Sequence, residues 1–167
     1  MDADEPGWPI IDDFFRAEIE GRSVVTAHRY LRVRGRLMVF LETGDMALGL
    51  GTQTAALLDA ERQFHDAGAF WTLFGPAELV CCLPSFVHDT WLPGGLAEAR
   101  TQVSLVARLL THLSRQRLID RRLTSGALHE AEAAVAHARR RLAERPATPS
   151  GGASMPDRFR QQPGPQW

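Results

Sequence analysis

The sequence predicts an all-α fold, a compact bundle of about five to six helices. In several segments the apolar residues recur at spacings of three and four, which places them on one face of a helix. Glycines, prolines and small hydroxyl residues separate these segments and mark where helices start and stop. No alternation of apolar and polar residues is long enough for a confident strand. We therefore expect helices only.

The segment 96–117 is the most clearly amphipathic, and we expect the rest of the chain to be organised around it. Its apolar stripe, which we expect to be buried, consists of Leu96, Ala99, Val103, Val106, Leu110 and Leu113. A second stripe carries only small polar and cationic side chains, and these are Arg100, Ser104, Arg108, Thr111 and Arg115. This second stripe can face an anion.

Two helices are expected before the first long loop. The first follows Pro9, which the first turn of a helix tolerates, and stops at Gly21. Ser23 can cap the second, over 24–43, which ends before Gly44. Its buried seam is Tyr30, Val33, Leu37 and Phe40, and its opposite side carries Arg29, Arg32 and Arg36. The second helix thus has a basic stripe like that of 96–117.

The middle and the end of the chain are expected to be helices joined by short connections. Residues 44–51 predict a loop, and a helix capped by Thr52 follows with Ala56, Ala60 and Phe64 in line. The aromatic cluster 70–74 predicts a core plug rather than a ligand pocket. A turn at 77–82 and a two-turn helix at 84–92, with Phe86, Val87 and Trp91 inward, precede the central helix. The last helix, 127–144, buries Leu128, Ala131, Val135, Ala138 and Leu142.

We expect one helical domain at 9–145, between a leader at 1–8 and a disordered tail at 146–167 that is rich in proline, glycine, glutamine and serine. The two cysteines, Cys81 and Cys82, are adjacent, which fits a reducing compartment better than a disulfide framework. No stretch approaches the roughly 20 apolar residues of a membrane span. We therefore expect a cytoplasmic protein without a membrane partner.

Charge is distributed unevenly along the chain although the net charge is only -1. All 19 basic residues are arginine, which suits fork-like contacts to phosphate but also follows from a GC-rich coding composition. Residues 21–41 hold five arginines and no acid, and 100–122 hold six arginines and one aspartate. If these segments pack side by side, one face is basic. The alternative is an ordinary solvated surface.

No motif for catalysis or metal binding is present. The six histidines are scattered singly, and adjacent cysteines without a second pair are a poor zinc signature. The chain has no G-x-S-x-G elbow, no G-x-G-x-x-G fingerprint and no P-loop. We therefore expect no enzyme activity, no cofactor and no metal.

Several short phrases between about residues 10 and 120 match one known family. Thr26 and Tyr30 open a helix that ends in Phe40 and Leu41, Leu83 and Phe86 form an L-x-x-F pattern, and a closing phrase runs from Leu113 through Leu118 and Ile119. The chain in this respect resembles the N-terminal core-binding domain of tyrosine recombinases, the phage integrase family, which is a small SAM-like helical bundle. The resemblance implies that the arginine faces lie on DNA. The catalytic half has no counterpart, since lysine is absent and Tyr30, the only tyrosine, sits on the core seam.

The sequence therefore predicts a non-catalytic protein that binds double-stranded DNA, an accessory factor or truncated integrase-like product of a mobile element. Phosphate contacts from such side chains position a protein on a duplex without reading bases. The candidate DNA-binding residues are Arg29, Arg32, Arg36, Arg100, Ser104, Arg108 and Arg115. The alternative is a helical protein–protein interaction module with no nucleic-acid role, whose basic stripes meet an acidic partner or the chain's own acidic segments.

Overall fold

The computed structural model describes residues 9–65 and 67–145, and within them it confirms the all-α prediction. This part of the chain forms eight α-helices and no strand. Six of the helices have ten or more residues, and α3 and α5 are single turns. Their bounds are α1 Pro9–Ile19, α2 Val24–Thr43, α3 Ala47–Leu50, α4 Thr52–Glu61, α5 Ala69–Leu73, α6 Pro76–Phe86, α7 Leu96–Arg115 and α8 Ser125–Glu144.

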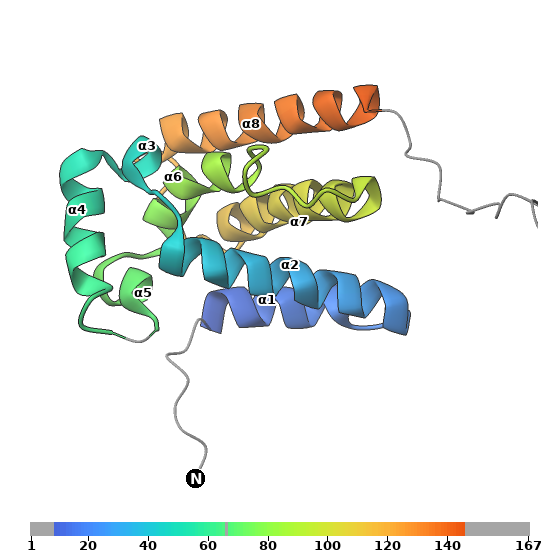
Figure 1. Cartoon of the computed structure of the whole chain (residues 1–167), viewed down its shortest axis with the longest axis horizontal. Coiled ribbons are helices and arrows are strands. Elements are labelled where there is room, and N and C mark those ends of the chain that lie inside the picture. The colour runs from blue at the N-terminus through green and yellow to red at the C-terminus, as the bar shows by residue number, and fades with distance from the viewer. Residues whose placement is uncertain (1–8, 66, 146–167) are drawn as a thin grey trace, which may run out of the picture.

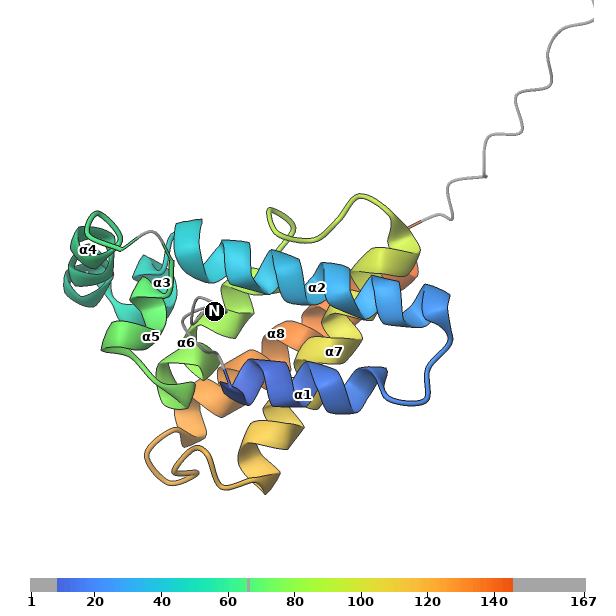
Figure 2. The same ribbon diagram turned by 90° about the horizontal axis from the view of Figure 1, so that it is seen from below.

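The long helices are stacked around α7. In Figure 1, α1 and α2 form one side of the molecule, α8 forms the opposite side, and α6 and α7 lie between them. Helices α3, α4 and α5 gather at one end (Figure 1). Seen from below, α7 crosses the α1–α2 pair steeply (Figure 2). Because α7 packs against α2, α6 and α8, it is the centre of the bundle, as its sequence predicts.

The predicted core stripe of α7 is buried except for Leu96, which is half-buried, and the buried surface is wider than predicted. Ala99, Val103 and Val106 are at most 2% exposed. Three further side chains of α7 are also buried, namely Gln102, Leu105 and Leu109. The helix is covered by neighbours on more than one side, so a stripe one residue wide underestimates its contact surface.

The seams of α2 and α8 and the N-cap of α2 are confirmed. Ser23 Oγ accepts a hydrogen bond from the Thr26 backbone N–H at 3.3 Å, which satisfies one of the free donors of the first turn. The buried residues of α2 are Tyr30, Val33, Leu37, Phe40 and Leu41, and those of α8 are the five that its period predicts. Periodicity thus identified the core side of all three 20-residue helices.

The prediction for 44–61 was wrong in two respects. Residues 47–50 form the short helix α3 instead of a loop, because Gly49 serves close packing on α6 rather than a turn. Helix α4 ends at Glu61, and Ala55 and Leu58 are its buried residues, whereas Phe64 is 82% exposed. The predicted Ala56 and Ala60 are also exposed. Helix α4 packs mainly against the short helices α3 and α5, so only a narrow part of its surface is buried.

The predictions of a turn at 77–82 and a helix at 84–92 were also wrong, because one helix, α6, covers all of the first segment and the first three residues of the second. Pro84 lies within its last turn, and the helix continues only to Phe86. The Gly75 N–H donates to the Glu78 carboxylate at 3.0 Å, which helps to fix the start of α6. Phe86 and Val87 are buried as expected, and Trp91 is half-buried.

The aromatic segment 70–74 packs on the core, as predicted. Phe70 is fully buried, and its ring centre lies 5.2 Å from that of Trp71 and 5.4 Å from that of Phe74. Cys81 and Cys82 are free thiols. None of the helices in the described ranges combines the length and apolar character that a membrane crossing needs. The predicted leader at 1–8 and tail at 146–167 lie outside the described residues.

Candidate functional site

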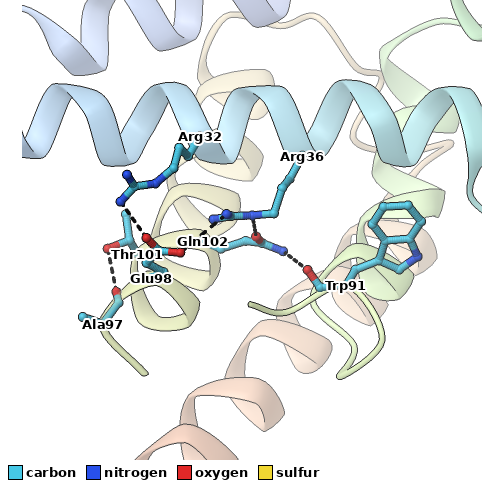
Figure 3. Close-up of polar contacts among 7 residues, drawn as sticks. All are labelled: Arg32, Arg36, Trp91, Ala97, Glu98, Thr101 and Gln102. Carbon is cyan, nitrogen blue, oxygen red and sulfur yellow. Dashed lines mark hydrogen bonds and ion pairs between the residues drawn. The ribbon is translucent and has the colours of Figure 1, made fainter. Parts of the chain in front are cut away.

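Two of the three arginines of the α2 stripe, Arg32 and Arg36, lie against the first turns of α7. Arg32 Nη2 donates to Glu98 Oε1 at 2.6 Å, and Arg36 Nη1 lies 3.7 Å from the other Glu98 oxygen. Arg36 Nε also donates to Gln102 Oε1 at 2.8 Å. Figure 3 shows both guanidinium groups directed from α2 toward α7. Glu98 therefore neutralises charge on the predicted α2 stripe.

Gln102 continues this network into the core. Its side chain is completely buried, and Nε2 donates to two backbone carbonyls, those of Phe86 and Trp91, each at 3.0 Å. Figure 3 shows the bond to Trp91. The amide thus connects α2, the end of α6 and the connection before α7. Burial lowers the pKa of Arg36, Glu98 opposes this change, and Arg32 adds to it.

The α7 stripe contacts α1, α2 and α8. Arg108 forms an ion pair with Glu18 of α1 and donates to the Tyr30 hydroxyl at 3.0 Å. Its guanidinium carbon also lies 5.3 Å from the centre of the Tyr30 ring, a cation–π contact. Arg100 Nη2 donates to the Leu142 carbonyl near the end of α8, at 3.3 Å. These two arginines therefore join helices of the bundle.

The remaining candidate residues are Arg29, Ser104 and Arg115. None of them has a hydrogen bond or ion pair to another residue within 9–65 and 67–145. Arg115 lines a groove of about 500 Å³ between α1 and α7, together with Arg108 and Thr111. Of the seven candidates, four thus have partners inside the protein and three do not.

The acidic partners are those that the alternative interpretation named. Glu18 belongs to the acidic segment at the start of the chain, and Glu98 to the acidic stretch before residue 100. Arg34 of α2, which was not a candidate, pairs with Asp12 of α1 at 2.8 Å. Basic and acidic segments far apart in the sequence therefore meet within the bundle.

A groove that the sequence did not predict lies between α3, α6 and α8, and we name it the α6–α8 groove. Its volume is about 480 Å³. Its apolar lining includes Leu48, Cys81, Pro84, Trp91 and Ala134, and its two acids are Asp45 and Glu130. A neighbouring hollow of about 340 Å³ shares Pro84, His88 and Ala134 with it and extends toward Arg141.

The lining of the α6–α8 groove contains two carboxylates and the Cys81 thiol. Burial raises the pKa of the Cys81 thiol, and the carboxylates of Glu78 and Glu130 raise it further. A raised pKa keeps the sulfur protonated, so Cys81 is a poor nucleophile. Within the described ranges, no three His, Cys, Asp or Glu side chains are placed so that they could hold a metal ion. The groove thus offers apolar surface next to two carboxylates.

Sequence reasoning missed the groove because its lining comes from four separate segments. Leu48 lies on α3, Cys81 on α6, Trp91 in the connection before α7, and Glu130 on α8. No periodic pattern links these positions. Leu48 lies in a short segment rich in glycine, and only its 91% exposure in the fold distinguishes it from a core residue.

Comparisons with protein-family models, with curated proteins and with solved structures find no match to this chain. The resemblance to a recombinase core-binding domain therefore stays a prediction, and the candidate function has to be argued from the geometry of the chain itself.

Proposed function

We propose that the protein is a non-catalytic helical module that binds a segment of a partner protein in the α6–α8 groove. The observation that carries the proposal is the lining of this groove. Leu48 and Trp91 offer apolar surface, and Asp45 and Glu130 offer negative charge without an arginine among the lining residues. A concave apolar site with a few polar groups is the usual form of a binding site.

The lining indicates what kind of segment would fit. An aliphatic or aromatic side chain would lie against Leu48, Pro84 and Trp91, and an arginine or lysine would lie next to Glu130. Glu130 has no ion-pair partner within the described ranges. An arginine or lysine of the partner would therefore not have to displace a basic side chain of this chain from Glu130. The partner segment is therefore basic and carries an apolar anchor.

A titration with designed peptides tests this proposal. The probe is a peptide of about 14 residues in which leucines recur at helical spacing on one face and arginines lie on the other face. Its counterpart has glutamate in place of each arginine. We expect calorimetry to detect binding of the arginine peptide only. We expect Glu130→Arg to weaken binding about tenfold, which corresponds to about 1.4 kcal/mol.

Glu132→Arg is the matched control, because Glu132 is exposed on the same helix and makes the same charge change outside the groove lining. If both variants weaken binding equally, the peptide responds to overall charge and not to the groove. If the arginine peptide does not bind the natural chain, the proposal is wrong.

DNA binding is our second candidate, and the observation that favours it is the pair Arg29 and Arg115. Neither guanidinium has a partner within the described residues, so both can meet phosphate. The resemblance to recombinase core-binding domains would make such a protein an accessory factor of recombination.

A fluorescent duplex at several salt concentrations tests the second candidate. We expect the affinity to fall steeply as the salt concentration rises. In the joint variant Arg29→Glu, Arg115→Glu, the slope of log affinity against log salt concentration should decrease by the amount expected for the loss of about two phosphate contacts. The control is Arg139→Glu with Arg140→Glu, which changes the same charge on α8. Absence of binding at about 50 mM salt would exclude this function.

A further inference from the structure

The outer face of α2 presents an apolar stripe that no other described helix covers. Its aliphatic members are Val24, Leu31 and Val39, which are 72%, 49% and 54% exposed. Together with His28, Gly35 and Glu42 they follow spacings of four, three, four, four and three, so they share one face of the helix. This face is opposite the buried seam of α2.

Gly35 is at the centre of this stripe and has no packing reason within the chain. A Cβ added there would have no heavy atom within 4 Å, and its φ is not in the left-handed region. A glycine in a helix interior costs stability relative to alanine, but it lets another group approach the backbone closely. Because Gly35 has no side chain, a second helix could approach the backbone of α2 most closely at this point of the stripe.

The arginines beside the stripe do not prevent such an approach. Arg32 and Arg36 lie on the side of α2 that faces α7, and Glu98 pairs with both. On the other side, Arg34 pairs with Asp12. Each flank of the apolar face thus has a carboxylate next to its arginines, and this lowers the repulsion between two copies there.

We propose that this face binds a second copy of the chain, with the two α2 helices antiparallel and a two-fold axis at Gly35. In that register Leu31 of one copy lies opposite Val39 of the other, and Gly35 lies opposite Gly35. A two-fold interface of this kind uses the same patch on both copies. The α6–α8 groove is on a different surface, so the dimer does not depend on the proposed function.

Charge complementarity selects this register. It places His28 of each copy opposite Glu42 of the other. His28 is exposed, and Glu42 uses Oε1 to accept from the Gly68 N–H at 2.7 Å, which leaves Oε2 for the imidazole. Because the axis repeats the contact, two such pairs border the four aliphatic side chains that meet at the centre. A parallel pairing would instead place His28 opposite His28.

Sedimentation equilibrium of the full chain from about 1 to 100 µM tests the dimer. We expect a monomer–dimer equilibrium, and Leu31→Glu should weaken it at least tenfold with an unchanged circular dichroism spectrum. Leu57→Glu is the matched control, because Leu57 is 55% exposed on α4 and lies outside the stripe. A chain that stays monomeric throughout, or a dimer that Leu31→Glu leaves intact, would overturn the proposal.

Cross-linking tests the register. A cysteine at the two-fold axis faces its own copy, so Gly35→Cys should give a covalent dimer under mild oxidation, linked through residue 35 in peptide mapping. Leu57→Cys should not. A dimer linked instead through Leu57→Cys, or a Gly35→Cys chain that does not cross-link while the dimer forms, would reject the antiparallel arrangement.

Discussion

Replacing Gln102 with leucine gives the most direct test of how the bundle is held together. The two side chains are similar in size, so the change removes hydrogen bonds with little change in packing volume. It leaves the carbonyls of Phe86 and Trp91 without their donor and Arg36 Nε without its acceptor. We expect a large loss of stability from a substitution that makes a buried position more apolar.

The magnitude follows from the burial of each group left without a partner. The Phe86 carbonyl makes its bond to Gln102 in a fully buried position, and such an unpaired group costs about 1–3 kcal/mol. The Trp91 carbonyl is part-buried and contributes less. The Arg36 side chain is 26% exposed, so water and Glu98 can replace its lost contact. The sum is about 2–4 kcal/mol.

Urea unfolding followed by circular dichroism measures this loss. With a slope of about 2 kcal/mol per molar, the midpoint should fall by about 1–2 M. Gln53→Leu is the control, because Gln53 is exposed on α4 and the same exchange there should change stability by less than about 0.5 kcal/mol. A Gln102→Leu midpoint within that margin would show that the network does not stabilise the fold.

Three further changes test other parts of the fold. Gly49→Ala should cost about 1–3 kcal/mol in the same assay, since its Cβ would overlap the Cys81 carbonyl oxygen, whereas Gly126→Ala, with open space around it, should not destabilise. Arg117 has a φ of 55° after the end of α7, so Arg117→Gly should increase the free energy of unfolding by up to about 1 kcal/mol and raise the melting temperature. A lower melting temperature in the variant would contradict this. Burial raises the pKa of the Cys82 thiol from 9.0 to about 12, so the folded protein keeps a proton there that the unfolded chain loses, and stability should fall as pH rises from 9 to 12. Between pH 9 and pH 10.5 the free energy of unfolding should fall by about 1–2 kcal/mol less in Cys82→Ala than in the natural chain. Parallel curves of unfolding free energy against pH for the two proteins would refute the prediction.

The buried face of a helix was predictable from the sequence where a long segment buries one face over its whole length. It was less predictable in short helices that bury only one or two residues. In α8 the apolar residues repeat over 20 residues, so the pattern alone identifies the core face. In α4 only Ala55 and Leu58 are buried, and two positions are too few to define a period. Pro84 suggested a break in α6, but a proline in the last turn removes a bond only near a helix end that is irregular in any case.

The partners of the arginines were not predictable, although their helix faces were. Arg108 meets Glu18 across 90 residues of sequence, and Arg32 meets Glu98 across 66. A helical period shows which side chains lie together on one helix, but not which neighbouring helix they face. The residues around Gln102 include Arg100, Thr101 and Ser104, so the local sequence did not mark this amide as buried, although a buried amide needs partners.

These internal partners also decide which substitutions can report on DNA binding. Arg32, Arg36 and Arg108 each contact an acid or an amide of another helix, so a glutamate at any of them would put like charges together inside the bundle. Loss of DNA binding in such a variant could reflect loss of structure. Arg29 and Arg115 have no such contact among the described residues, and their reversal leaves the bundle's ion pairs in place. A DNA surface on this protein therefore has to be demonstrated at Arg29 and Arg115.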